Sequence, residues 1–375
     1  MTGTSIDGID LAIAAIQGEG LAMRAELRAF RSAGLGPLAA RLRAAADQHP
    51  VTAGELADLA RELGELHAHE ALALLREAGL DRIELAAIHG QTIFHRPPSS
   101  LQLLNAHPIA EALGCDTVFD LRGHDLALGG QGAPLTPLAD WVLFRAPHAR
   151  AIVNLGGFAN ATMLPADDGA PHHGQVAAIR GADLCACNQL LDRAAREVLG
   201  RDFDADGAVA ASGTRHDAAF AEACALLAPK PDGRSLGTGD ELFGWVARHR
   251  RTLAPADVLA TASDAVGSTI GTALAAHGVR DAVLAGGGAR HRRLTQAIAS
   301  AARVPVGPSD RLGVPVGARE ALGWAVLGAL AQDGVDVALP QVTRRLAPAA
   351  PGRDPRVSGA WLRFRTPTEH GMNRY

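Results

Sequence analysis

The sequence of 375 residues contains almost no lysine. Lys230 is the single lysine, and the rest of the 36 basic residues are arginines. A Walker A loop ends its glycine-rich segment with a lysine, and a protein kinase carries a lysine on a strand of its nucleotide site. Lys230 stands in neither context, which excludes both of these ways of binding ATP.

Other absences narrow the class of protein further. No apolar run approaches the roughly 20 residues that span a bilayer, and the start shows no basic stretch followed by an apolar one, so we expect neither a membrane span nor a signal peptide. The net charge of −4 is spread along the chain without blocks, which argues against nucleic acid or lipid as partner. The four cysteines form no CxxC pair, which favours a reducing, cytoplasmic location. The expected partner is a small molecule.

Hydrophobic periodicity alternates between strand and helix signals, as in an α/β protein. Residues 9–17 and 21–31 flank a Gly-Glu-Gly turn and predict a hairpin. Helices are predicted over 37–48 and 52–78, the second with Thr52 and Glu55 as a capping box. At about 100 to 200 residues per domain, the length predicts two domains.

The second half of the sequence restarts the same plan. A hairpin with a glycine turn opens it at residues 150–164, residues 175–183 predict a third strand, and DAVLAGGGA at 281–289 predicts a buried strand that runs into a glycine turn. We interpret this as a diverged duplication, with lobes at 1–145 and 146–375 that face each other across a cleft. Glycine turns expose backbone N–H groups that attract phosphates, so no lysine is needed for a nucleotide.

These motifs together resemble the anhydro-N-acetylmuramic acid kinase family. The matching segments, in order, are GTSIDGID near the start, HGQT at 89–92, DLRGHD and GGQGAPL within 120–135, NLGGFANAT at 154–162, AGGGA at 285–289, Glu320-Ala321 and VSGAW at 357–361. The resemblance implies a duplicated two-lobed α/β ATPase fold of the actin and Hsp70 (ribonuclease H-like) type with a central interlobe cleft. It also implies ATP-dependent opening of the 1,6-anhydro ring of a muramic acid sugar with phosphorylation at O6, a step of cell-wall recycling.

The resemblance assigns roles to particular residues. Asp183, in GADLCACNQLLD, takes the place of the family's catalytic base, with Asn188 and Asp192 also in place. The expected sugar-binding residues are Gln91, Thr92, Asp120, Arg122, Gln131 and Glu320. The expected ATP-binding residues are Gly3, Thr4, Ser5, Ile6, Asp7, Gly8, Ile9, Asp10, Asn154, Gly156, Gly157, Gly286, Gly287 and Gly288. Mg²⁺ is expected with ATP, without an identified ligand, and His89 and His95 are expected to pack beside the sugar site.

Three departures from the family pattern have consequences. Cys185 and Cys187 replace glycines, and we expect their side chains to crowd the bound phosphate or sugar. Asp240 stands where a cation is usual. The family has a strand before GTS whereas Met1 stands almost on that loop, so we expect this strand to be absent from the first sheet, with the true start upstream as the favoured explanation.

Two further readings stay open at this point. A catalytically impaired member of the family would bind sugar or nucleotide as a sensor, and a kinase of the same fold would act on another sugar. A sensor is expected to lose its catalytic base, whereas Asp183 is retained. The sequence leaves the oligomeric state open, a homodimer included.

Overall fold

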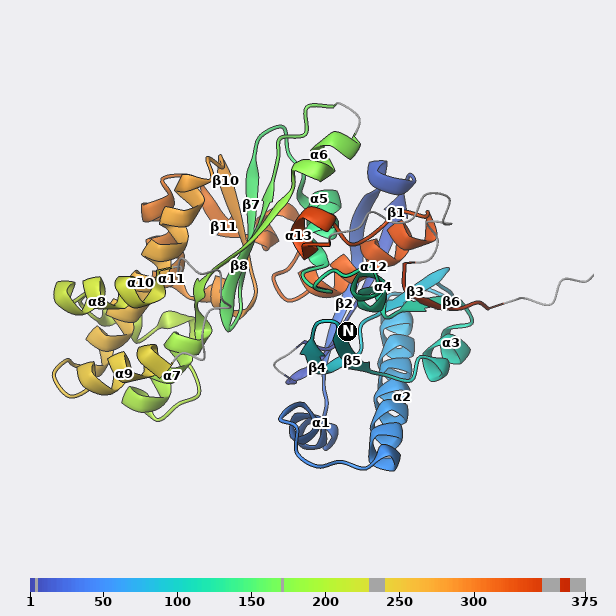
Figure 1. The fold of residues 1–375 in the computed structure, drawn as a ribbon, viewed down its shortest axis with the longest axis horizontal. Helices are drawn as coiled ribbons and strands as arrows, with labels where there is room; N and C mark the ends of the chain where they lie inside the picture. Colours follow the sequence, from blue (N-terminus) through green and yellow to red (C-terminus); the bar gives the residue numbers. More distant parts are fainter. Residues whose placement is uncertain (4–5, 170–171, 229–239, 346–357, 365–375) are drawn as a thin grey trace, which may run out of the picture. The chain divides into compact units, whose positions relative to one another are not determined.

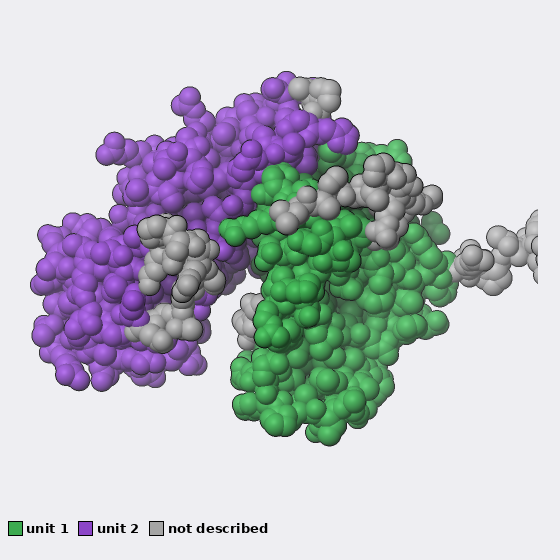
Figure 2. All heavy atoms as spheres, viewed as in Figure 1, with its two compact units in different colours: residues 1–143, 320–375 green, residues 144–319 purple. Residues whose placement is uncertain are grey.

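The computed structural model describes the chain except residues 4–5, 170–171, 229–239, 346–357 and 365–375. The chain divides into two compact units, which Figure 2 colours separately: unit 1 comprises Met1–Leu143 and Glu320–Tyr375, and unit 2 comprises Phe144–Arg319. The expected division placed residues 320–375 in the second lobe, whereas the structure returns them to the first.

Unit 2 is built on an unbroken five-stranded sheet (Figure 1). Its strands are β7 (Arg150–Leu155), β8 (Phe158–Leu164), β9 (Arg180–Ala186), β10 (Asp281–Ala285) and β11 (Val306–Pro308). Their order is β11-β10-β7-β8-β9, with β7 antiparallel to β8 and parallel to β10. Five of the six residues of β7 are buried, because helices cover both faces of a sheet at its central strand.

The helices of unit 2 supply most of its hydrophobic core. They are α6 (His172–Ala178), α7 (Asn188–Leu199), α8 (Asp217–Leu227), α9 (Asp240–His249), α10 (Pro255–Ala276) and α11 (Arg292–Ala302). The third strand predicted over 175–183 is partly wrong, since α6 occupies its first half and β9 begins at Arg180. Gln175 and Ala177–Ala178 favour a helix, and the apolar residues among them do not distinguish the two structures over so short a run.

Unit 1 contains the same kinds of elements, but its described strands form three separate sheets. The strands are β1 (Gly8–Gln17) paired with β2 (Arg24–Gly34), β4 (Gln91–Arg96) paired with β5 (Ser99–Leu103), and β3 (Leu85–Ile88) with β6 (Asp116–Phe119) and β12 (Ala360–Leu362). The helices are α1 (Leu38–Ala46), α2 (Ala53–Glu77), α3 (His107–Leu113), α4 (Leu121–Ala127), α5 (Thr136–Phe144), α12 (Arg319–Gln332) and α13 (Pro340–Thr343).

The C-terminal segment belongs to unit 1 because it packs there. Helix α12 lies so close to β3 that a Cβ added to Gly328 would be 2.4 Å from the Cβ of Ala87. Strand β12 pairs antiparallel with β6, and Trp361 of β12 stands opposite Val118 of β6. These contacts join the end of the chain to strands more than 200 residues earlier, and periodicity in the sequence does not reveal such pairing.

Local sequence signals in unit 1 were accurate where they were strong. The β1–β2 hairpin is confirmed, and so is the capping box of α2: Thr52 Oγ1 accepts from the backbone N–H of Glu55, and Glu55 Oε2 accepts from that of Thr52 at 2.7 Å. The hairpin β4–β5 and helix α4 are not among the elements that the sequence analysis predicts. Within the described residues, no helix is long and apolar enough to cross a membrane.

Candidate functional site

Two glycine turns of unit 2 come together at one edge of its sheet. Because β7 and β10 are parallel neighbours, the turn that follows β7 at Gly156–Gly157 lies beside the turn that follows β10 at Gly286–Gly288. Gly286 has φ +78°, and a Cβ there would lie 2.6 Å from Oδ1 of Asn154. Only glycine fits both the conformation and the space, so Gly286 lets the two turns pack closely against each other.

Helix α7 begins at the same place. Asn188 Nδ2 donates to the carbonyl of Leu155 at 3.1 Å, and the backbone N–H of Asn188 donates to that of Gly156 at 3.0 Å. Asn188 therefore fixes the first glycine turn to the helix start. The sequence identified Asn188 as part of a matching motif but gave it no role, because its contact is made only in the folded sheet.

Asp183 lies on β9 and is exposed. It stands opposite Asn160 of the neighbouring strand β8. The main-chain pairing of two strands fixes the backbone of this carboxylate while its side chain stays open to solvent, an arrangement suited to a base that takes a proton from water.

The expectation for the two cysteines that follow Asp183 is wrong. Cys185 and Cys187 are fully buried and belong to the hydrophobic core of unit 2. Burial raises the pKa of the Cys185 thiol to about 12, so it stays protonated. Neither residue has a positive φ. Their side chains fill the core between the sheet and the helices. Replacing the two glycines with cysteines therefore takes no space from a ligand.

In unit 1 the loop before β1 is held by its neighbours. Ile6 has φ +53°, which is unusual for a β-branched residue, and Arg43 Nη2 donates to its carbonyl at 2.9 Å. The side chains of Ile6 and Ile9 are buried in the core, so these two residues offer a nucleotide only their backbone. Gly8 leaves no room for a Cβ, which would lie 2.8 Å from a carbonyl of β2.

The other expected nucleotide residues of this loop are described only in part. Thr4 and Ser5 lie outside the described residues. In a different part of the chain, Gly237–Gly239 and the side chain of Asp240, which stands where the family has a cation, also lie outside them. Asp10 Oδ1 accepts from Ser32 Oγ at 2.5 Å across the hairpin. Gly3 and Asp7 are placed in the loop, and Ile6 N–H donates to the Gly3 carbonyl at 3.3 Å.

Two of the residues predicted to bind the sugar, Asp120 and Arg122, lie close together at the start of α4. Burial lowers the pKa of Arg122, and the nearby carboxylate of Asp120 raises it. Asp120 itself has φ +50° and caps α4 by accepting from the backbone N–H of Gly123 at 3.1 Å. Burial and then the charge of Arg122 lower the pKa of His89 to about 3, and the same two causes lower that of His95. Nε of Arg122 is buried and has no hydrogen-bond partner among the described residues.

Gln131 is placed by a buried network that the sequence analysis missed. Asp125 is fully buried; its Oδ2 accepts from the backbone N–H of Gly132 and its Oδ1 from Thr343 Oγ1, both at 2.8 Å. Arg345 Nη1 lies 3.8 Å from the same carboxylate, and the N–H of Gln131 donates to the Thr343 carbonyl at 2.8 Å. The glycine-rich loop is thus wrapped around one carboxylate. The sequence feature that could have revealed this network is the aspartate shortly before GGQG.

Gln91 and Thr92 begin β4, and Glu320 lies on α12. Gln91 is fully buried, and its Oε1 has no partner among the described residues. The ring of His89 stacks on Trp324, with centroids 4.3 Å apart and planes 7° from parallel. Since Trp324 is one helical turn after Glu320, this stack brings Glu320 toward the strand that leads into Gln91.

A resident metal site is not evident. Among the described residues, no group of three or more His, Cys, Asp or Glu side chains is arranged to hold a metal ion. Mg²⁺ commonly binds through nucleotide phosphates and water with only one or two carboxylates. The described side chains therefore offer no protein cage for Mg²⁺.

The glycine turns at a sheet edge, the exposed carboxylate and the polar cluster define the class of a phosphotransferase built from two α/β units. The chain belongs to the anhydro-N-acetylmuramic acid kinase family, because the sequence model of that family matches residues 1–352. The predicted family and its α/β fold class are therefore confirmed. The central cleft and the individual site residues stay predictions.

Curated relatives carry the same family name. The anhydro-N-acetylmuramic acid kinase of Bordetella pertussis is 38% identical over 92% of this chain and 91% of its own, and that of Xanthomonas campestris is 37% identical over 93% and 94%. Among solved structures, (R)-2-hydroxyglutaryl-CoA dehydratase component A of Acidaminococcus fermentans is similar over 85% of this chain and 98% of its own, with 15% identity and a TM-score of 0.41.

Proposed function

We propose that this chain uses ATP to open the 1,6-anhydro ring of anhydro-N-acetylmuramic acid and phosphorylate O6, which gives N-acetylmuramic acid 6-phosphate and ADP. The family match over residues 1–352 is the observation that carries the proposal. The exposed Asp183 on β9 supports an active enzyme. No described feature favours the sensor reading.

The anhydro bridge dictates the chemistry. The sugar has no free hydroxyl at C6, so water attacks C1 and Asp183 takes the proton of that water. The bond between C1 and the bridging oxygen breaks, and this oxygen, now O6, attacks the γ-phosphorus. The bond to the oxygen of the departing ADP then breaks. Water, sugar and ATP are consumed together, and each bond formed is matched by one broken.

Each unit contributes different contacts in this proposal. In unit 1, the unpartnered Nε of Arg122 suits the lactyl carboxylate, and Oε1 of Gln91 suits a sugar hydroxyl. In unit 2, the turns Gly156–Gly157 and Gly286–Gly288 suit the phosphates through their backbone N–H groups. Mg²⁺ bound with ATP would neutralise charge on the phosphates.

Product analysis tests the proposal. The protein is incubated with ATP and anhydro-N-acetylmuramic acid, and mass spectrometry and phosphorus NMR are used to look for the 6-phosphate of the opened sugar. We expect this product with one ADP for each sugar. ADP release that does not depend on the sugar, or a phosphorylated sugar that keeps its anhydro bridge, would refute the proposed reaction.

A further inference from the structure

The turn Gly286–Gly288 of unit 2 is held on two sides. On one side it lies against β7 and the start of α7: a Cβ added to Gly288 would be 2.9 Å from the Cβ of Leu155 and 3.1 Å from Oδ1 of Asn188. On the other side the chain leads into His291, which is buried and whose backbone N–H donates to the carbonyl of Gly288 at 3.0 Å. The position of the turn therefore depends on the contacts that hold His291.

The ring of His291 caps helix α11. Its Nδ1 accepts from the backbone N–H of Leu294 at 3.2 Å, and the carbonyl of His291 accepts from the N–H of Thr295 at 3.0 Å. The cap satisfies one of the N–H groups that the first turn of a helix leaves unpaired. Asn, Asp or Ser supplies the same kind of acceptor in most helices. The cap alone therefore does not require an imidazole ring.

The far side of the ring contacts two other segments of unit 2. Nε2 of His291 lies 3.3 Å from Oγ of Ser263, which is fully buried on α10. The ring also covers Gly207, where an added Cβ would be 2.4 Å from Cε1 of the imidazole. Asp204 closes the segment 204–210 around this contact by accepting from two of its backbone N–H groups, at 3.0 and 2.8 Å. One side chain thus joins the end of the glycine turn to α10 and to the segment 204–210.

The hydrogen bonds of His291 define one tautomer. Nδ1 accepts a backbone N–H, so it carries no proton. Ser263 Oγ donates to the carbonyl of Leu259 at 2.8 Å, so the same oxygen accepts from Nε2. Both ring nitrogens are satisfied in the neutral ring with its proton on Nε2, and a second proton on Nδ1 would displace the cap of α11.

Charged groups act on this ring from three segments. Burial lowers the pKa of His291 and Arg293 of α11 lowers it further, while the carboxylates of Asp204 and Asp206 oppose them. Arg293 is itself paired with Asp264 of α10, whose carboxylate accepts from Nε and Nη2 at 2.8 Å each. The ring is therefore neutral at pH 7, as the hydrogen bonds require.

We propose that His291 is a positioning residue for the nucleotide: its ring fixes the turn Gly286–Gly288 against α10 and the segment 204–210. This role rests on the proposed function, in which the turn binds the phosphates of ATP. His291 acts through the turn and not on the reacting atoms. Loss of the ring should therefore weaken the binding of ADP and ATP more than it slows the chemical step.

His291→Ala tests the proposal against a matched loss of a cap. His216 caps α8 in the same way, with Nδ1 accepting from the N–H of Ala219 at 3.3 Å, but its ring does not lie at the end of the turn. We expect the Kd for ADP, measured by calorimetry, to rise about tenfold or more in His291→Ala and to stay within about twofold of the parent in His216→Ala. The KM for ATP should rise by a larger factor than kcat falls.

His291→Asn separates the cap from the positioning of the turn. The amide oxygen supplies the acceptor for Leu294, but the shorter side chain does not reach Ser263. Urea unfolding should show stability close to that of the parent, and the affinity for ADP should stay reduced. Full recovery of the affinity would show that the cap is sufficient and would overturn the proposal. Nitrogen-15 NMR of the parent that finds a proton on Nδ1 at pH 7 would also overturn it.

Binding and turnover together distinguish this role from the proposed function. A parent that phosphorylates the anhydro sugar, with unchanged ADP affinity in His291→Ala, would overturn the role of His291 and leave the function intact. A parent that forms no sugar phosphate, but loses ADP affinity in His291→Ala, would refute the function and support the role. A parent that binds no ADP would refute both.

Discussion

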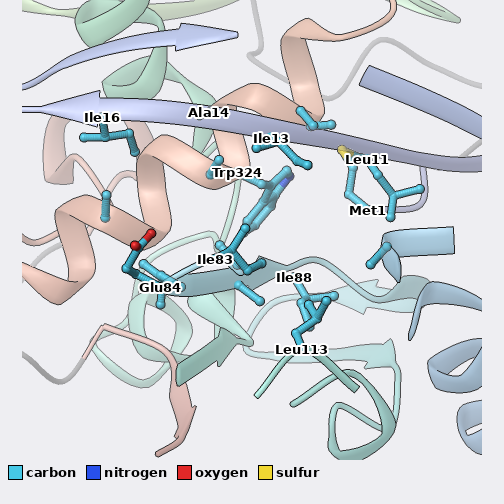
Figure 3. Close-up of a pocket in the computed structure, with 18 of the residues that line it drawn as sticks. Met1, Leu11, Ile13, Ala14, Ile16, Ile83, Glu84, Ile88, Leu113 and Trp324 are labelled. Carbon is cyan, nitrogen blue, oxygen red and sulfur yellow. The ribbon is translucent and has the colours of Figure 1, made fainter. Parts of the chain in front are cut away.

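The two units share one plan of strands, but within the part of the chain that the structure describes only unit 2 joins them into a single sheet. In both, an antiparallel hairpin and a parallel pair of strands are present, and in unit 2 β7 joins them into one five-stranded sheet. In unit 1 the hairpin and the parallel pair lie in different sheets with a cavity between them (Figure 3). The comparison shows that the central strand does more than add hydrogen bonds: it holds together the two halves of a sheet whose remaining elements are all present.

The difference extends to how each unit supports its predicted site residues. Unit 2 places Asn154 and Asp183 directly on strands of the complete sheet. In unit 1, the buried carboxylate of Asp125 holds the loop that carries Gln131. Glu320 lies on α12, and Trp324 of the same helix stacks on His89. We infer that side-chain networks position the unit 1 residues and main-chain pairing positions those of unit 2.

The largest expected effect is that of Asp183→Asn in unit 2. The amide keeps the shape of the carboxylate but cannot take a proton, so kcat should fall by about 10² to 10⁴ with the affinities for sugar and ATP nearly unchanged. Steady-state kinetics and binding calorimetry measure both. The control is Asp217→Asn, another exposed carboxylate of unit 2, which should keep the parent rate. Equal rates for Asp183→Asn and the parent would rule out Asp183 as the base.

The matching change in unit 1 is Asp125→Asn. An amide cannot accept from both Gly132 and Thr343 as a carboxylate does, and it leaves the buried charge of Arg345 less compensated. The loop that carries Gln131 should loosen, and KM for the sugar should rise about tenfold or more. Asp58→Asn, on the surface of α2, removes the same charge as a control. An unchanged KM would show that the loop needs no such support.

A pair of size changes compares the two interiors directly. Cys185→Gly removes a buried side chain from the filled core of unit 2 and should lower the free energy of unfolding by about 2 kcal/mol without raising activity. Ala14→Val adds two methyl groups at the cavity of unit 1, where space is available, and should change stability by less than about 0.5 kcal/mol. Urea unfolding measures both. Equal losses for the two variants would mean that the cavity behaves as a filled core.

A pH dependence of stability is expected from the Met1 amino group. Its pKa is about 6 in the folded chain against 8.0 in the unfolded one. Between these values the unfolded chain binds more protons, so the free energy of unfolding should rise from pH 6 to pH 8, by at most about 2 kcal/mol. His67 and His89 titrate lower, near 3.

An Nα-acetylated chain serves as the control for this effect. Acetylation removes the charge of the amino group and leaves the titrating side chains, including Asp10 and Glu320, in place. The difference between the two urea unfolding profiles therefore reports Met1 alone. Parallel profiles from pH 6 to pH 8 would contradict the burial of a charged amino group at this position.

Periodicity and capping residues predicted the individual elements well. Periodicity and the Thr52–Glu55 box predicted α2, and the glycine turn between apolar runs predicted the β1–β2 hairpin. Hairpin β4–β5 was missed because Pro97-Pro98 reads as a break, whereas the two strands pair on either side of it. Helix α4 was missed because Gly123 lies inside it, beneath the cap formed by Asp120.

The positions of side chains were harder to predict than the elements. The motif aligned Cys185 and Cys187 with glycines beside a ligand, but both side chains lie in the hydrophobic core. Cys185 belongs to the end of β9, where three successive residues are buried, and Cys187 is the N-cap residue of α7. The network of Asp125, Thr343 and Arg345 joins residues more than 200 positions apart, and periodicity cannot show such a contact. Thus the sequence locates the motifs, and only the fold shows what supports them.

Hydrogen exchange of the unmodified chain tests the comparison between the units most directly. In one sample, mass spectrometry follows the amides of residues 11–16 and 85–88 in unit 1 and those of β7 and β10 in unit 2. We expect β7 and β10 to exchange only on opening of unit 2, and the unit 1 amides on the open edges to exchange at least about 100-fold faster. Equal protection of the two sets would contradict the account, because it would mean that the sheet of unit 1 is already complete.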